Sequence, residues 1–270
     1  MIKLIAVDMD GTLLNSAREL PAENILALQR AAQAGVKIVL CTGRPKSGVQ
    51  PYFNKLELTE EEYVIMNNGC SVYNTKEWDL IDYSALSYRE LEILEQAVLD
   101  CPDVCLTLTG ERTYYALGKK VPELVQADAE LVFTTARAAS LDQVRSDSEI
   151  IFQAMYMAEK AQLDRFQKIR ETELGQLFSA VRSQNDIFEA MPKGVTKGKA
   201  LQALSNQLGF NAGEVMAIGD AANDLEMLKF AGVSVAMANA SQQVKEHSRY
   251  LTVSNDEAGV ARAIDKYVFS

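Results

Sequence analysis

The stretch MIKLIAVDMDGTLLN (residues 1–15) runs from an apolar segment directly into a pair of acidic residues. Residues 2–7 are apolar with one exception, which is typical of a strand buried in a parallel sheet. Asp8 and Asp10 follow at once, and Gly11 allows the chain to turn away sharply after them. Because ligands of open parallel sheets bind beyond the carboxyl ends of the strands, this order predicts a core strand that delivers two carboxylates to a functional site.

The composition is that of a soluble globular protein with room for two domains. The 270 residues are 48% hydrophobic and 24% charged, which suffices for a sizeable core. The start lacks the basic and apolar stretches of a secretory signal, and no segment reaches the roughly 18 apolar residues of a membrane span. The four cysteines form no C-x-x-C pair and there is one histidine, which argues for free thiols and against a cysteine-based zinc site. We therefore expect a cytoplasmic protein.

The net charge of −10 restricts the partners. Nucleic-acid binding draws most of its affinity from clustered cations, so a general nucleic-acid binder is not expected, and neither is a membrane partner. Any anionic substrate must be held by local cations. The sequence leaves the oligomeric state open.

Both ends of the chain read as halves of one parallel, Rossmann-like α/β sheet. Short apolar strands alternate with segments of helical periodicity, in which a proline suits the start and a glycine the end of a helix. The predicted strands are residues 2–7, 36–41, 63–66, 214–220 and 232–237, and the predicted helices include residues 21–35 and 223–232.

The middle of the chain shows a mixed pattern of helices and strands. Residues 84–190 are predicted to form an inserted α+β cap domain, and residues 1–83 and 191–270 the core. The insertion carries no motif that names a substrate, although substrate specificity is expected to reside there.

The polar motifs all fall where a core strand ends or a helix begins. They are Asp8 to Thr12, Thr42-Gly43-Arg44, Gly219 to Asp224, and Lys197 at the start of a helix. Since the carboxyl ends of parallel strands share one edge of the sheet, these groups are expected to converge.

What is absent restricts the chemistry. No cysteine is followed by a C-x5-R pattern, the histidine has no R-H-G context, and GRPKSGVQ (residues 43–50) lacks the lysine and hydroxyl of a P-loop. The carboxylates of Asp8, Asp10 and Asp220 form an all-oxygen set that suits Mg²⁺. Lys197 and Thr42 then suit a phosphate group.

Four motifs in this order resemble those of the haloacid dehalogenase superfamily. They are DMDGTLL (8–14), CTGRP (41–45), MPKGVTKGKAL (191–201) and IGDAANDLEML (218–228). The long insertion, with MNNG (66–69) and AMANA (236–240), resembles the Cof-type sugar phosphatases with a subfamily IIB (C2-type) cap.

This resemblance implies a role for each motif residue. Asp8 would be the nucleophile that forms an aspartyl-phosphate, and Asp10 the general acid and base. The Mg²⁺ would be held by Asp8, the Asp10 carbonyl and Asp220, with Asp224 or Ala221 completing the shell. The phosphoryl group would be cradled by Met9 and Gly43 through their backbones and by Thr42, Lys197 and Asn223.

Some alternatives remain open at this point. Arg44 either contacts the substrate or pairs with a carboxylate at the rim of the site. The expected function is a Mg²⁺-dependent phosphatase of small phosphorylated metabolites, most simply sugar phosphates. A phosphosugar mutase on the same scaffold and a receiver-like signalling domain that carries an aspartyl-phosphate are the alternatives.

Overall fold

The chain folds into two compact units in the computed structural model, which describes residues 1–269. Unit 1 comprises Met1–Gly43, Gln50–Asp82 and the chain from Thr196 onward, and unit 2 comprises Arg44–Val49 and Tyr83–Val195. The structure therefore groups the short segment after Gly43 with the inserted part of the chain. The assignment of substrate specificity to residues 84–190 stays a prediction.

The sheet of unit 1 has eight strands in the order β14-β13-β12-β1-β2-β3-β4-β5. The six strands from β14 to β3 run parallel, whereas β4 pairs antiparallel with β3. The predicted parallel α/β core is confirmed, and β4, which was not among the predicted strands, adds an antiparallel strand beside it. The strands are β1 (Leu4–Asp8), β2 (Lys37–Cys41), β3 (Tyr63–Met66), β4 (Ser71–Asn74), β5 (Leu80–Tyr83), β12 (Val215–Gly219), β13 (Val233–Ala236) and β14 (Tyr250–Leu251).

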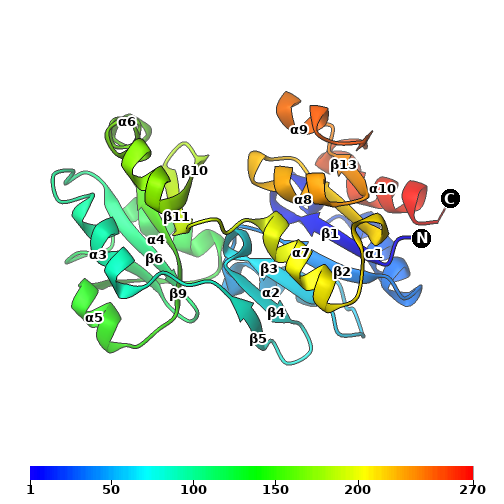
Figure 1. The fold of residues 1–270 in the computed structure, drawn as a ribbon, viewed down its shortest axis with the longest axis horizontal. Coiled ribbons are helices and arrows are strands. Elements are labelled where there is room, and N and C mark those ends of the chain that lie inside the picture. The colour runs from blue at the N-terminus through cyan, green and yellow to red at the C-terminus, as the bar shows by residue number, and fades with distance from the viewer. Residues whose placement is uncertain (270) are drawn as a thin grey trace. The chain divides into compact units, whose positions relative to one another are not determined.

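Helices cover this sheet in two groups. Because crossover connections are right-handed, steps from β1 in opposite directions along the sheet place their helices on opposite faces. The helices α7 (Lys197–Gln207) and α8 (Leu225–Phe230) pack side by side, and α1 (Ala22–Gln33) packs against α10 (Gly259–Tyr267) (Figure 1). The remaining helices are α2 (Lys46–Lys55) and α9 (Gln242–Glu246).

Unit 2 is built on a six-stranded sheet in the order β10-β11-β9-β6-β7-β8. One face forms a core with α3, α5 and α6, centred on Tyr156 and Phe188, and the other packs Met155 and Met157 under α4. The predicted α+β character of this region is therefore present. The elements are α3 (Tyr88–Gln96), β6 (Cys105–Gly110), β7 (Tyr114–Leu117), α4 (Glu123–Leu131), β8 (Ala136–Ala139), α5 (Leu141–Ser146), β9 (Ile151–Met157), α6 (Lys160–Leu177), β10 (Phe178–Gln184) and β11 (Ile187–Pro192).

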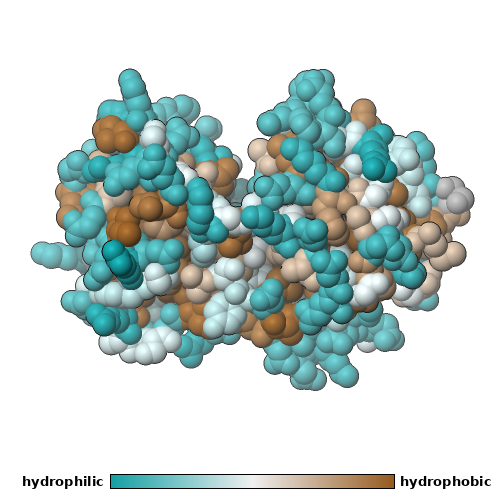
Figure 2. Space-filling model, in the orientation of Figure 1, coloured by the Kyte–Doolittle hydropathy of each residue, from teal (hydrophilic) through white to brown (hydrophobic). Residues whose placement is uncertain are grey.

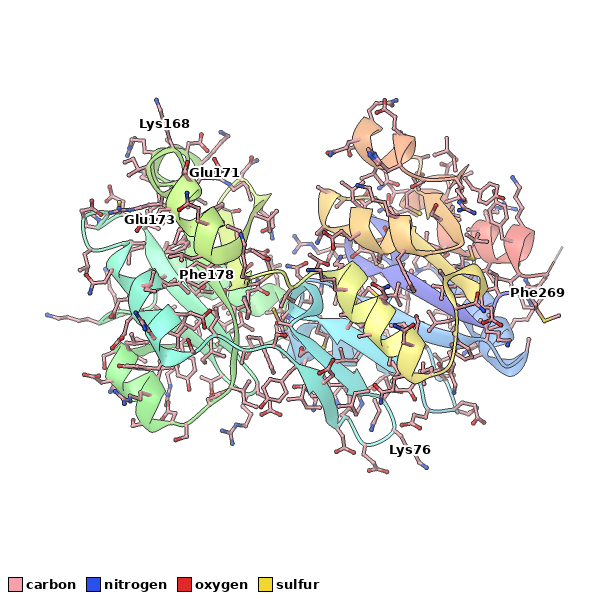
Figure 3. The ribbon with its side chains drawn as sticks, viewed as in Figure 1. Lys76, Lys168, Glu171, Glu173, Phe178 and Phe269 are labelled. Carbon is pink, nitrogen blue, oxygen red and sulfur yellow. The ribbon has the colours of Figure 1, made fainter. Side chains whose placement is uncertain are left out.

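The helix α6 has charged side chains on the surface and is followed by an apolar residue of the core. Lys168, Glu171 and Glu173 are exposed on the helix, whereas Phe178, the first residue of β10 directly after it, is buried in the core (Figure 3). Hydrophilic side chains dominate the face shown in Figure 2. Among residues 1–269, no helix combines the length and apolar character needed to cross a bilayer.

Glu62 is a buried carboxylate just before β3, at the edge of the sheet opposite the carboxyl ends of the parallel strands. Its Oε2 accepts the backbone N–H of Ile38 at 2.6 Å. Burial raises the pKa of this carboxyl from its ordinary 4.5 to about 7, against the opposing effects of the Ile38 N–H and the Lys37 charge. The folded state therefore holds this proton more tightly than the unfolded chain does.

This shift predicts a pH-dependent loss of stability. The contribution of Glu62 is fully present below about pH 4.5 and is lost as the pH rises through about 7, at a cost of about 2 to 3 kcal/mol. The Glu62→Gln variant keeps an oxygen for the Ile38 N–H but has no charge to bury. Urea denaturation at pH 5 and pH 8 should show that the wild type loses more unfolding free energy between these values than the variant. Equal losses in the two proteins would contradict the assignment.

Candidate active site

The site forms where β1, β2 and β12 end at one edge of the unit 1 sheet. The strands β2 and β12 flank β1 in parallel, and Asp8 at the end of β1 lies beside Cys41 at the end of β2. Thr42 and Asp220 each follow the last residue of their strand. The predicted convergence of strand-end motifs is thus present within unit 1.

Lys197 forms the centre of the site through two buried ion pairs. Its Nζ donates to Asp8 Oδ1 at 2.6 Å and to Asp224 Oδ1 at 2.8 Å, and the lysine side chain is only 1% exposed. Lys197 is the first residue of α7, and the Thr196 hydroxyl caps that helix by accepting the Lys199 N–H. Burial disfavours the ammonium form, but Asp224 and Asp8 together hold the pKa of Lys197 above its ordinary value. The lysine is therefore a permanent local cation.

The carboxyl group of Asp8 is buried among competing charges. Burial and then the charge of Asp224 raise its pKa well above the usual 3.8, Lys197 acts in the opposite direction, and Asp220 raises it further. A cation at this position favours the ionised carboxylate, which is the form that can attack an electrophile.

Asp220 is held by the loop after β1. The Thr12 hydroxyl donates to Asp220 Oδ1 at 2.8 Å. Burial raises the pKa of Asp220 to about 6, although the Thr12 hydrogen bond lowers it. Gly11 is required beside it, because its φ is +76° and a methyl group there would lie 2.5 Å from Asp220 Oδ2. The loop and the carboxylate are therefore closely fitted to each other.

Three of the predicted metal-binding residues are gathered in one cluster. Asp8, Asp220 and Asp224 each offer an oxygen, and these atoms lie within 4.8 Å of one another. All-carboxylate donors at this spacing fit a hard cation such as Mg²⁺. Such a cation would also relieve the repulsion among the carboxylates, which adds to the effect of burial in raising the pKa values of Asp8 and Asp220. Asp10 is exposed in the following loop and is not part of this cluster of side chains.

Asp224 has a second set of contacts that sequence reasoning did not foresee. Its Oδ2 accepts the backbone N–H groups of Asp220 and Ala221, both at 3.0 Å, while its Oδ1 accepts from Lys197. The Ala221 N–H is therefore directed at a carboxylate. Asp224 thus fixes the loop after β12 and the lysine at the same time.

The predicted phosphate-binding residues border the same edge. Thr42 is buried, and its N–H donates to the Ile65 carbonyl at 2.8 Å. Asn223 is half-buried and donates from Nδ2 to Asn68 Oδ1 at 3.0 Å, while Met9 is buried in the loop directly after Asp8. Gly43 leaves room for Asn68, whose amide would lie 3.2 Å from a methyl group at this position.

Arg44 lies in the segment that the structure groups with unit 2. Its guanidinium Nη1 donates to the Gly48 carbonyl at 3.3 Å, and the residue is 8% exposed. The predicted contact of Arg44 with a substrate stays a prediction.

Two asparagines support the site without having been predicted. Asn68 contacts Gly43 and Asn223, and Asn239 donates from Nδ2 to the Gly11 carbonyl at 2.7 Å. Both lie in stretches whose resemblance to the family was noted, MNNG and AMANA, but no pattern in those stretches indicated a chemical role for them.

Close helix packing joins two of the motifs. A methyl group at Gly198 would lie 2.5 Å from both the backbone carbonyl carbon and the Cβ of Glu226 in α8, so α7 and α8 approach here more closely than any other residue at position 198 would allow. The Thr196 hydroxyl also donates to the Glu226 carboxylate. Lys197 and Asp224 are thereby held on one pair of helices.

Comparison with known proteins agrees with this site. The family model of the haloacid dehalogenase-like hydrolases matches residues 5–264. The chain is 36% identical to "Putative phosphatase YxeH" of Bacillus subtilis over 100% of both chains. It is 30% identical to the 5-amino-6-(5-phospho-D-ribitylamino)uracil phosphatase YcsE of the same organism, over 99% of this chain and 96% of that one. A solved haloacid dehalogenase-like hydrolase from Bacteroides thetaiotaomicron matches with a TM-score of 0.88 and 29% identity, over 98% of this chain and 99% of that chain.

These matches span nearly the whole chain and include the strands, loops and helix that build the site. The predicted family and α/β fold class are confirmed. The chain belongs to the haloacid dehalogenase-like hydrolase family, and its enzyme class is that of the phosphatases in this family.

Proposed function

We propose that the protein is a Mg²⁺-dependent phosphatase of small phosphorylated metabolites, with sugar and polyol phosphates as the substrate class. The observation that carries the proposal is the buried Lys197, which bonds the Asp8 carboxylate at 2.6 Å beside two further carboxylates. A fixed cation next to a buried carboxylate suits covalent transfer of an anionic group.

In this proposal Asp8 attacks phosphorus and Asp10 transfers protons. The Asp8 carboxylate displaces the alcohol, forming an aspartyl-phosphate, and Asp10 protonates the leaving oxygen. Asp10 then takes a proton from the water that hydrolyses the intermediate, which releases inorganic phosphate and restores Asp8. The exposure of Asp10 agrees with a group that exchanges protons with solvent.

The remaining motif residues would bind the phosphoryl group. Hydrolysis of a phosphate monoester can require up to about 10²¹-fold acceleration, and general acid catalysis supplies about 10²- to 10⁴-fold of it. Cations and N–H groups directed at the phosphoryl oxygens must therefore supply much of the rest. Lys197 and the Thr42 hydroxyl, with the Asn223 amide and the backbone of Met9 and Gly43, are the groups that fit this role.

Asp8, Asp220 and the Asp10 carbonyl would hold the metal ion, which when bound neutralises negative charge on the phosphoryl oxygens. Asp224 would act through its contacts to Lys197 and to the loop after β12. The lower pKa that a nearby cation gives to carboxyl groups favours the ionised Asp8 in such a site.

The substrate class is proposed from the relatives. YcsE is named for a phosphorylated ribitylamino compound, which is a polyol phosphate. The inserted domain at residues 84–190 is proposed to select among such compounds, and a cytoplasmic location stays a prediction. Release of inorganic phosphate from a panel of sugar, polyol and nucleotide phosphates tests this directly. If the protein released phosphate from none of these compounds, the proposal would be overturned.

The same assay separates the two alternatives that the sequence leaves open. A mutase would pass the phosphoryl group from Asp8 back to a second hydroxyl of the sugar, so isotopic phosphate would appear in an isomeric sugar phosphate. A receiver-like protein incubated with acetyl phosphate would accumulate a long-lived phosphoprotein without turnover. Multiple turnovers with release of inorganic phosphate favour the phosphatase over both.

Metal removal should abolish the activity reversibly. Dialysis of the protein against EDTA leaves three carboxylates and one lysine, so the site lacks the charge needed to bind an anionic substrate. We expect turnover to fall to background and to return when Mg²⁺ is added in excess of the chelator. Circular dichroism should remain unchanged during the cycle, which excludes unfolding as the cause. Full activity in EDTA would exclude the metal requirement.

A further inference from the structure

The turn between β3 and β4 has an unusual backbone. Asn67, Asn68 and Gly69 follow one another with φ values of +50°, +55° and +103°. Residues other than glycine rarely adopt this left-handed region, and asparagine is among the few that enter it more readily. Such a run persists where the surrounding structure holds it, and it is concentrated at functional sites.

Asn68 joins this turn to two of the predicted phosphate-binding segments. Its backbone N–H donates to the Thr42 carbonyl at 3.0 Å, and its side chain lies against Gly43. Its Oδ1 accepts a hydrogen bond from Asn223 Nδ2 at 3.0 Å, across 155 positions of the sequence. One side chain therefore contacts the segments after β2 and after β12 together.

Gly69 joins the same turn to the start of α7. A methyl group on Gly69 would lie 2.5 Å from the Thr196 carbonyl oxygen and 3.0 Å from the Lys197 nitrogen. Only a glycine allows this approach. The residue that follows Asn68 therefore contacts the start of the helix that carries Lys197. The turn thus contacts three of the four segments that would bind the phosphoryl group, and the fourth is the loop after β1 that carries Met9.

The hydrogen bond to Asn68 has a chemical consequence for Asn223. A side-chain amide has two N–H donors on nitrogen and two lone pairs on oxygen, and rotation by 180° exchanges them. Because Asn68 Oδ1 accepts from one N–H of Asn223, the nitrogen side of that amide is fixed and its second N–H remains for another acceptor. In the reversed orientation the amide oxygen would repel an anion.

We propose that Asn68 is a positioning residue, which orients the Asn223 amide so that it donates to the transferring phosphoryl group. This inference rests on the proposed phosphatase function and adds a residue outside the four sequence motifs. The effect should be largest when charge spreads over the phosphoryl oxygens in the transition state, so it should appear mainly in kcat.

A double-mutant cycle with Asn68→Gly and Asn223→Ala tests the proposal. Glycine keeps the left-handed backbone and removes only the side chain, so the fold and the melting temperature should be retained. With p-nitrophenyl phosphate we expect Asn68→Gly to lower kcat about tenfold while KM changes less than about threefold. In the Asn223→Ala background, Asn68→Gly should lower kcat less than about twofold, because the amide that Asn68 orients is then absent.

The Glu57→Gly variant is a matched control. Glu57 also has a left-handed backbone, with φ +50°, but it is exposed and lies between α2 and β3, away from the site. Its kcat should equal that of the wild type.

Each outcome of the cycle supports or overturns the inference. A tenfold loss that vanishes without Asn223 supports it. Suppose that the wild type is active and that the losses of kcat from the two substitutions multiply in the double variant, or that Asn68→Gly lowers only the melting temperature. Either result overturns the positioning role and leaves the proposed function intact. A wild type that releases no phosphate from any substrate of the panel overturns the proposed function, and the inference with it.

Discussion

The Asp8→Asn variant should fold normally and hydrolyse no substrate. Its amide oxygen can still accept from Lys197 Nζ, so the buried hydrogen bond at 2.6 Å in the wild type keeps a partner. The variant also removes one of three clustered negative charges, which relieves repulsion. An amide is not a nucleophile toward phosphorus, however, and loss of a nucleophile typically costs more than about 10³-fold in kcat. Release of p-nitrophenol from p-nitrophenyl phosphate, together with a melting curve, measures both effects.

A matched control distinguishes the nucleophile from a general effect of charge. Asp79 is an exposed aspartate of unit 1, and Asp79→Asn should leave both kcat and melting temperature unchanged. Mass spectrometry after rapid acid quench should also detect a phosphorylated Asp8 in the wild type, and no phosphorylation at the same position of the Asp8→Asn variant. Substantial turnover by Asp8→Asn would exclude Asp8 as the nucleophile.

The Lys197→Met variant should lose both stability and activity. Methionine has a similar length but no charge, so the carboxylates of Asp8 and Asp224 would remain buried without their cation. Removing one partner of a buried ion pair typically costs about 3 to 5 kcal/mol. Urea denaturation at pH 7 should show a loss of this size, and kcat/KM should fall by more than about 10²-fold because a phosphoryl-binding cation is absent.

Lys199 provides the comparison for this variant. It lies two residues further along α7, is exposed, and contributes its backbone N–H to the helix cap. Lys199→Met should change the unfolding free energy by less than about 0.5 kcal/mol, as is usual for an exposed position. If Lys197→Met were as stable as Lys199→Met, the ion pairs described for Lys197 would not form in solution.

The parts of the fold that the sequence predicted are those with a strong local pattern. The strand at residues 63–66 and the helix beginning after Pro21 match β3 and α1, because an apolar run or a helical period was bounded by turn residues. Several of the elements that were missed are short strands with a weak apolar pattern. β8 contains Arg137 between alanines and β5 has no fully buried residue, so neither sequence shows the apolar run that marks a buried strand.

The candidate site was predictable to the extent that it lies at strand ends. The rule that ligands bind beyond the carboxyl ends of parallel strands sufficed to bring together Asp8, Thr42 and Asp220. It could not find Asn68. This residue lies at the same edge, just after β3, but its contact with Asn223 depends on a left-handed turn. It also could not divide the two oxygens of Asp224 between a lysine and two backbone N–H groups, since that division depends on side-chain geometry.

The contact at Gly198 determines when the charged side chains of the site are brought together. Since Gly198 of α7 packs directly against Glu226 of α8, the lysine on one helix and the aspartate just before the other are held together by helix packing as well as by their ion pair. The unfavourable step of bringing like charges together and removing them from water is therefore completed once, during folding. Each catalytic cycle then begins with the lysine and its carboxylates already in place, and no further reorganisation of them is needed.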